Sequence, residues 1–258
     1  MPEGLDRPTQ SGLARLGEGV RAFSPAPQHF YRTAALPCPY LPGKVERKLV
    51  TELAGREAAS FYNDLSRAGF RRSHNLAYRP ACVGCSACLP VRIPVADFTQ
   101  TRSLRRIRNL NADLHVRVAP SVVTIEQYRL FLRYQRQRHS ASDMAAMSYG
   151  DYRAMVEDSP VATRLVELRD REGALHGACL VDVLDDGLSA VYSFYDPTEA
   201  KRGLGNLLVM ALIDETLRRR LPYVYLGYWI AESPKMAYKE RFRPLEGLEP
   251  KGWRRISG

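Results

Sequence analysis

The spacing of apolar residues in the second half of the chain predicts one long helix among several strands. Five apolar residues recur at three- and four-residue intervals on one helical face: Leu204, Leu207, Leu208, Ala211 and Leu212. Apolar-rich runs predict strands before and after this helix, at residues 164–169, 174–183, 188–195 and 223–226. We therefore predict an α+β fold in which antiparallel strands lead into a helix that begins at glycine residues and then into another strand.

The first half of the chain has shorter predicted elements. Helices are predicted at residues 56–67, 103–111, 124–139 and 149–157, and strands at residues 44–53, 70–73, 76–79, 90–94 and 114–118. In the helix at 124–139, Tyr128, Phe131, Leu132 and Gln135 alternate with arginines. We expect the apolar stripe to face the core and the arginines to face outward.

Composition sets the class of protein. The chain has 258 residues with 45% hydrophobic content, enough for one large domain or two modest domains with real cores. Residues 1–28 are rich in Gly, Pro, Ser and Arg without an apolar period, and we expect a flexible leader there. Neither a secretory signal nor an apolar run of membrane-spanning length is recognised in the sequence, so we expect a cytoplasmic protein.

A net charge of +10, mostly from arginine, favours a polyanionic partner. The arginines form two clusters, one at Arg102, Arg105, Arg106 and Arg108 and the other at Arg129, Arg133, Arg136 and Arg138. Such clustering is typical of nucleic-acid contacts. A solvated helix face remains an equal alternative for the second cluster.

The cysteines are unevenly placed. In CVGCSAC, two residues separate Cys82 from Cys85 and two separate Cys85 from Cys88. Cys38 lies upstream. Three such thiolates with Cys38 as a fourth ligand would complete a zinc site or hold an iron–sulfur cluster. The alternative is a turn whose small thiols pack in the interior. We favour a metal-binding or redox-sensitive cluster, and we expect Cys179, in an apolar run, to belong to the core.

Glycines mark the start of the long helix. In GLG, Gly203 and Gly205 let backbone N–H groups approach an anion at the helix amino terminus. This layout resembles an acyl-CoA N-acetyltransferase, in which R/Q-x-x-G-x-G/A holds the coenzyme pyrophosphate. The first position of that motif is Ala200 in this chain.

A closer resemblance extends over nearly the whole chain from Tyr31 onward. It is carried by ordered segments at residues 38–43 (CPYLPG), 69–93 (GFRRSHNLAYRPACVGCSACLPVRI), 105–110 (RRIRNL), 133–139 (RYQRQRH), 142–144 (SDM), 192–197 (YSFYDP) and 225–246 (YLGYWIAESPKMAYKERFRPLE). These segments resemble the aminoacyl-tRNA-protein transferase family, specifically its short bacterial leucyl branch.

The resemblance implies a division into a smaller cysteine-bearing amino-terminal domain at residues 29–120 and an acetyltransferase-like (GNAT-like) domain at residues 121–258. It also implies transfer of leucine from leucyl-tRNA to proteins that begin with Asp or Glu, marking them for N-degron degradation. Arginyl transfer to the same acceptors and acetyl-CoA-dependent N-acetylation are the enzyme alternatives. A zinc-ribbon module that binds RNA is the non-enzymatic alternative.

Candidate site residues lie on the family-matching segments. For the transfer step we predict Tyr195, Asp196, Tyr228, Lys235, Tyr238 and Lys239. For the acceptor carboxylate we predict Arg79 and Arg92, which flank the cysteine loop. For tRNA we predict Arg105, Arg106, Arg108, Arg202, Gly203 and Gly205.

An aminoacyl ester is already activated, so no enzymic nucleophile and no cofactor is expected for transfer itself. The arginyl members of the family carry an early CxxC and have been associated with an iron–sulfur cluster. Leu41 stands at the second of those early positions in this chain, which counts against a cluster and against arginyl specificity. Cys82 and Cys85 remain as substitutes for the missing thiol.

Overall fold

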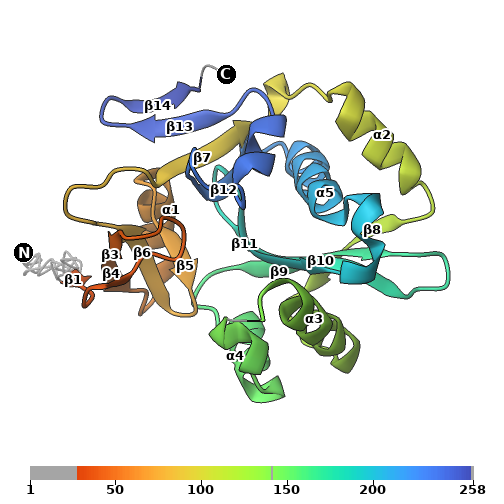
Figure 1. Ribbon diagram of the computed structural model, residues 1–258, viewed down its shortest axis with the longest axis horizontal. Coiled ribbons are helices and arrows are strands. Elements are labelled where there is room, and N and C mark those ends of the chain that lie inside the picture. The colour runs from red at the N-terminus through yellow and green to blue at the C-terminus, as the bar shows by residue number, and fades with distance from the viewer. Residues whose placement is uncertain (1–27, 141, 257–258) are drawn as a thin grey trace, which may run out of the picture.

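The computed structural model describes residues 28–140 and 142–256, and its largest feature is an eight-stranded sheet of order β14-β13-β7-β12-β11-β10-β9-β8 (Figure 1). All neighbouring strands of this sheet are antiparallel except β11 and β12. Its strands are β7 (Leu89–Pro94), β8 (His115–Pro120), β9 (Thr163–Arg169), β10 (Leu175–Val183), β11 (Gly187–Tyr195), β12 (Tyr223–Trp229), β13 (Glu246–Glu249) and β14 (Gly252–Arg255).

Helices cover both faces of this sheet. Figure 1 shows α5 (Leu204–Arg218) and α2 (Arg102–Leu110) on one face, and α3 (Ile125–Arg138) and α4 (Tyr149–Glu157) on the other. Alternate residues of a strand point to opposite faces. In β10, Cys179 and Val181 accordingly pack in the core beneath α5, whereas Ala178 and Leu180 pack in the core beneath α3 and α4. Cys179 therefore belongs to the core, as predicted.

The two parallel strands separate soon after they begin. Residues Gly187–Ser189 of β11 pair with Tyr223–Tyr225 of β12, and α5 makes the crossover between the strands. A bulge leaves Val191 of β11 without a partner on β10, and a second bulge leaves Leu226 of β12 without a partner on β7. Because bulges bend a strand and interrupt pairing, they open the sheet where β11 and β12 diverge.

A smaller four-stranded sheet packs beside the large one (Figure 1). Its order is β1-β4-β6-β5, and it is accompanied by a two-stranded hairpin and one helix. These elements are β1 (Tyr31–Arg32), β2 (Leu36–Pro37), β3 (Val45–Glu46), β4 (Lys48–Glu52), α1 (Ala58–Arg67), β5 (Arg71–Ser73) and β6 (Leu76–Pro80). Tyr225 of β12 and Leu184, directly after β10, belong to the hydrophobic core of this region, so the two sheets share a packed interface.

Most predicted elements are found within one or two residues of their predicted ends. The helix predicted at 124–139 is α3, and its arginines Arg129, Arg133, Arg136 and Arg138 are exposed as expected. The sequence analysis missed β1, β2, β13, β14 and four 3-10 helices: η1 (Val95–Asp97), η2 (Asp143–Ala146), η3 (Pro197–Arg202) and η4 (Ala237–Arg241).

The predicted domain boundary at residue 120 stays a prediction. Strands β7 and β8, which precede it, both belong to the eight-stranded sheet. Residues 1–27 of the predicted leader lie outside the described residues. Within residues 28–140 and 142–256, every helix is too short or too polar to cross a lipid bilayer.

Candidate active site

Two adjoining cavities open where β11 and β12 diverge. The first has a volume of about 310 Å³ and the second of about 450 Å³. They share lining residues from α3 and its C-cap, β11, α5, η4 and the segment before η4, namely Tyr134, His139, Ser193, Val209, Lys235 and Tyr238. A ligand that occupies one cavity therefore borders the other.

The first cavity combines an apolar wall with positive charge. Leu208, Val209 and Leu212 of α5, with Leu226 of β12, supply the apolar wall. Arg71, Lys235 and Lys239 supply the cations, and Arg138 adds another in the second cavity. Among the described residues that line either cavity, there is no Asp or Glu. The site therefore favours ligands that carry negative charge beside an apolar group.

Arg71 reaches the first cavity from β5 of the small sheet. Its Nη2 donates to the carbonyl oxygens of Ala190 and Val191, the latter at 3.0 Å, beside the bulge of β11. Its guanidinium lies against Gly227 of β12, where an added Cβ would come within 1.5 Å of Arg71 Nη1. Gly227 also has φ +73°, so glycine is required there by conformation as well as by space.

Lys239 of η4 is buried beside the same cavity, 6% exposed. Its Nζ donates to the carbonyl oxygen of Tyr228. Burial, followed by the charge of Arg71, lowers the pKa of Lys239 to about 7. Neighbouring Tyr238 lines both cavities, and burial raises its pKa to about 12. Lys239 is thus the cavity residue best suited to exchange a proton near neutral pH.

The second cavity lies at the amino terminus of α5. Gly203 caps this helix in a left-handed conformation with φ +67°, and an added Cβ at Gly205 would lie 3.0 Å from the Tyr195 ring. Arg138, at the end of α3, places its guanidinium carbon 5.9 Å from the centre of the Tyr195 ring. Burial, then the charges of Lys235 and Arg138, lowers the pKa of His139. Unpaired helical N–H groups and these cations together favour an anion.

Four of the six residues predicted for the transfer step lie together in this site. Lys235 and Tyr238 line both cavities, Lys239 lines the first and Tyr195 the second. Tyr228 does not line either cavity, because its hydroxyl points toward the small sheet and donates to the carbonyls of Gly69 at 3.0 Å and Tyr78 at 3.1 Å. Tyr228 thus joins the two sheets.

Asp196 also lies off the lining of both cavities. Its carboxylate caps η3 by accepting from the Thr198 backbone N–H at 2.9 Å, and it pairs with Arg133 at 3.1 Å. Burial raises the pKa of Asp196, but the bonds from Thr198 and Arg133 outweigh burial and lower it below its usual value. The carboxylate is held by partners within the chain, and a role in transfer stays a prediction.

The two arginines predicted to bind the acceptor carboxylate lie apart from the two cavities. Arg92 is buried, pairs with Glu246 at 2.8 Å, and lies 3.5 Å from the centre of the Tyr223 ring. Arg79 is exposed and lines a separate surface cavity with Cys82, Cys85 and Cys88. Of the two, only Arg79 is without a carboxylate partner among the described residues.

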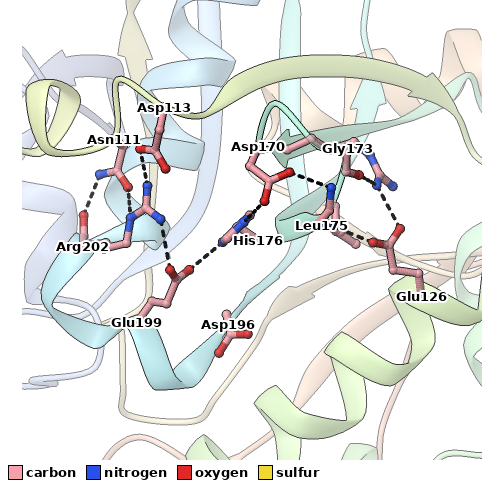
Figure 2. Close-up of polar contacts among 12 residues, drawn as sticks. Asn111, Asp113, Glu126, Asp170, Gly173, Leu175, His176, Asp196, Glu199 and Arg202 are labelled. Atoms are coloured by element: carbon pink, nitrogen blue, oxygen red, sulfur yellow. Dashed lines mark hydrogen bonds and ion pairs between the residues drawn. The ribbon is translucent and has the colours of Figure 1, made fainter.

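The residues predicted to bind tRNA have different environments. Arg105 and Arg106 are exposed on α2, and Arg108 pairs with Asp214 of α5 at 2.9 Å. Arg202 pairs with Asp113 at 2.5 Å and with Glu199 at 3.0 Å, and its Nε donates to Asn111. Figure 2 shows this network, in which Glu199 also contacts His176. Gly203 and Gly205 line the second cavity with Arg138.

The four clustered cysteines are free and half-buried. Burial, followed by the neighbouring thiols of Cys82, Cys38 and Cys85, raises the pKa of Cys88 to about 11. The thiols are therefore near one another, but among the described residues no three His, Cys, Asp or Glu side chains are arranged to hold a metal ion. Metal binding at this cysteine cluster therefore stays a prediction.

Three residues that line the cavities were not among the predicted site residues: Arg71, Arg138 and His139. Arg71 and Arg72 are adjacent in a short predicted strand, and the alternation of a strand places them on opposite faces. Two adjacent arginines in a strand are a sequence signal of a buried or contacting arginine, because one of the pair must face the protein interior or a neighbouring element.

Comparison with known proteins places the chain in a family. The family described as "Arginine-tRNA-protein transferase, C terminus" matches residues 126–249, and "Arginine-tRNA-protein transferase, N terminus" matches residues 36–106. A relative from Paramagnetospirillum magneticum named "Aspartate/glutamate leucyltransferase" is 56% identical over 90% of this chain and 95% of its own length. A relative of the same name from Rhodospirillum rubrum is 55% identical over 88% of this chain and 93% of its own length.

Among solved structures, the one described as L-PGS from Bacillus licheniformis has a TM-score of 0.50 at 13% identity. The likeness covers 77% of this chain and 65% of that chain, and it shows a shared fold only. The predicted α+β fold, with mostly antiparallel strands and a long helix between the last two long strands, is confirmed. The matches along both halves show that the chain belongs to the arginine-tRNA-protein transferase family, together with relatives named aspartate/glutamate leucyltransferases.

Proposed function

We propose that this chain transfers leucine from leucyl-tRNA to the amino-terminal Asp or Glu of proteins. Membership of the family and the name shared by relatives at 54–56% identity support this reaction. The structural observation that carries the proposal is the pair of adjoining cavities, which combine an apolar wall with cations and have no lining carboxylate among the described residues.

The proposed reaction is aminolysis of an ester. The α-amine of the acceptor attacks the carbonyl carbon of the leucyl ester, a C–N bond forms, and the C–O bond to the terminal ribose breaks. The ribose oxygen leaves with a proton, and the acceptor amine loses one. The enzyme must therefore bring the two substrates together, exclude water and accept a proton.

The lining of the first cavity favours leucine over arginine as the transferred residue. The side chains of Leu208, Val209, Leu212 and Leu226 offer apolar surface that matches a leucyl side chain. An arginyl side chain placed there would bring its guanidinium near Arg71 and Lys239, and the described lining residues include no carboxylate to pair with it. An unpaired charge inside a cavity carries a large desolvation cost.

The second cavity supports binding of the terminal nucleotide of the tRNA. The N–H groups at the start of α5, with Arg138 and Lys235, present positive charge to this space. A phosphate of the tRNA acceptor end suits such a helix terminus. The exposed arginines of α3 lead from the protein surface to Arg138 and offer further phosphate contacts.

Lys239 supports the proton-transfer part of the proposal. An α-ammonium group has a usual pKa of about 8, so a lysine with a pKa of about 7 can accept a proton from it with only a small free-energy difference. Aminoacylated tRNA is found in the cytoplasm. We therefore propose that the protein acts in the cytoplasm.

The test is a transfer assay with purified protein and a peptide that begins with Asp. Leucyl-tRNA, arginyl-tRNA and acetyl-CoA are offered as separate donors, and mass spectrometry identifies the product. Addition of leucine alone is expected. Addition of arginine would overturn the donor assignment while keeping the reaction class. An acetylated peptide with neither amino acid added would overturn the proposed reaction.

A further inference from the structure

We infer that Arg71 is the residue that pairs with the side-chain carboxylate of the acceptor's first residue. This inference rests on the proposed function, and it names the group that gives preference for Asp and Glu. It concerns a residue of the small sheet that reaches into the acetyltransferase-like part of the molecule.

Arg71 has no acidic partner among residues 28–140 and 142–256. Its Nη2 donates to the carbonyls of Ala190 and Val191, whereas neither Nε nor Nη1 forms a hydrogen bond with the described residues. The guanidinium also lines the first cavity. A guanidinium has five donors and keeps its charge in proteins, so donors remain for a ligand.

The buried arginines of the chain each have an acidic partner. Arg72 is paired with Asp182, and Arg92 with Glu246. Arg169 is paired with Glu167 and Glu126. Each of these charges is balanced within the chain, as expected for a charge removed from water. Arg71 is held by two backbone carbonyls but has no carboxylate partner among the described residues, which indicates that a ligand supplies one.

The strands next to Arg71 hold its guanidinium and leave room for it. At the Val191 bulge, two backbone carbonyls accept hydrogen bonds from Nη2 of Arg71. Gly227 leaves room for the plane of the guanidinium. Any side chain at Gly227 would displace Arg71, because even a Cβ would lie 1.5 Å from Nη1. Nη2 is common to both bidentate edges of a guanidinium, so a carboxylate would accept from Nε or Nη1 through a single charge-assisted hydrogen bond.

The charge of Arg71 lies close to Lys239, the residue proposed to accept the proton. Arg71 and Lys239 line the same cavity, and their charges are close enough for Arg71 to lower the pKa of Lys239. The α-amine and the side-chain carboxylate of Asp or Glu are separated by only a few bonds. With its carboxylate on Arg71, an acceptor would hold its amine within the same cavity as Lys239.

A tRNA phosphate is the less suitable ligand for Arg71. The second cavity, with the α5 amino terminus and Arg138, lies at the end away from Arg71, which lines only the first. The first cavity also carries the apolar wall that suits the leucyl group. Acceptor and donor side chains therefore belong in the first cavity, and the nucleotide belongs in the second.

The experiment compares acceptors that differ only in charge. Peptides that begin with Asp or with the isosteric Asn are offered to the wild-type protein and to the Arg71→Met, Arg71→Lys and Arg79→Met variants, with leucyl-tRNA as donor. The kcat/KM for Asp divided by that for Asn is the readout. Binding of the same peptides, labelled at their carboxyl end, is followed without tRNA by fluorescence anisotropy.

We expect Arg71→Met to reduce the Asp-to-Asn ratio by about 10- to 100-fold, the usual range for a charge-assisted pair. Arg71→Lys, which keeps the charge without the fork, should recover part of the ratio, and Arg79→Met should leave it unchanged. Equal losses for both peptides in Arg71→Met would assign Arg71 a structural role and overturn the inference. Loss of the ratio in Arg79→Met, with Arg71→Met unaffected, would also overturn it.

The binding measurement separates this inference from the proposed function. A wild-type protein that adds no leucine but binds the Asp peptide in an Arg71-dependent way would overturn the function and keep the inference. A wild-type protein that adds leucine but binds both peptides equally would keep the function and overturn the inference.

Discussion

Arg72 and Asp182 form an ion pair in which both side chains are fully buried, with Nη2–Oδ1 at 2.6 Å and Nε–Oδ2 at 2.8 Å. The pair joins β5 of the small sheet to β10 of the large sheet. Thr163 also donates to Asp182 at 3.1 Å. Because adjacent strand residues point to opposite faces, the pair that fixes Arg72 also directs Arg71 toward the first cavity.

This pair predicts a large loss of stability when one partner is neutralised. Asp182→Asn leaves the Arg72 charge buried without a counter-charge, and the free energy of unfolding should fall by about 3–5 kcal/mol. The control is Asp97→Asn, which removes the exposed pair between Asp97 and Arg255 and should cost less than about 1 kcal/mol. Chemical denaturation measures both changes. Equal losses in the two variants would contradict the prediction.

Lys239 predicts a pH dependence of stability. Burial first, and then Arg71, lowers its folded pKa to about 7, below the usual value of 10.5. The unfolded chain therefore binds the extra proton between these values, and the Lys239 contribution to stability increases as pH rises through this window, by at most about 1.4 kcal/mol per pH unit.

Replacing this lysine should remove that dependence. We expect Lys239→Met to be more stable relative to wild type at pH 7 than at pH 9, because the variant has no ammonium to bury. Denaturation of both proteins across this range measures the difference. Lys235→Met, at an exposed lining position, is the matched control and should follow the wild-type curve. A constant difference between Lys239→Met and wild type would show that Lys239 has an ordinary pKa.

The same lysine should matter for the rate. Arginine at position 239 keeps the charge but cannot release its proton near neutral pH, so Lys239→Arg should lower the single-turnover rate of leucine transfer by about 100-fold or more. Lys235→Arg is the control and should retain most activity. A Lys239→Arg variant with a wild-type rate would exclude Lys239 as the proton acceptor.

The elements with a regular apolar period could be predicted from the sequence. Helix α5 shows its buried face at three- and four-residue spacing, and α4 was predicted at Tyr149–Glu157, where it is found. The strands β13 and β14 were missed because they are short and their sequence carries charges and glycine without a continuous apolar run. They form a hairpin, and only β13 pairs with a strand distant in the sequence, β7.

The site was predicted less completely, because it is built from distant segments. Lys235, Tyr238 and Lys239 stand close together in the sequence and were found together. Arg71 reaches the same cavity from another sheet, and only the three-dimensional course of β5 and β11 reveals this. Asp196 suits a catalytic role by residue type alone, but its position at the cap of η3 occupies its carboxylate.

Salt dependence should identify the arginines that contact tRNA. A residue that neutralises one phosphate contributes about 0.7–0.9 to the slope of log affinity against log salt concentration. We expect Arg136→Gln and Arg138→Gln on α3 to flatten this slope, and Arg105→Gln and Arg106→Gln on α2 test the sequence-based assignment in the same way. Arg153→Gln on α4, whose arginine faces Glu157 at 3.9 Å, is the control. An unchanged slope in all α3 variants would contradict a tRNA path along that helix.

His176 offers a last prediction, with the opposite pH dependence. Its Nδ1 contacts Glu199 at 2.7 Å and its Nε2 contacts Asp170 at 3.0 Å, so the ring bridges β10 to η3 (Figure 2). Burial lowers the pKa of His176, but these two carboxylates outweigh burial and raise it above its usual value. The stabilisation is therefore complete below a pH of about 6.5 and is lost as pH rises through the raised folded pKa.

His176→Gln should consequently lose more stability at pH 6 than at pH 9. His115→Gln, at an exposed position of β8, is the control and should show little change at either pH. Thermal unfolding of the three proteins in matched buffers measures the difference. A loss in His176→Gln that is the same at both pH values would mean that the ring acts as a neutral hydrogen-bonding bridge, since only its protonated form draws added stability from Asp170 and Glu199.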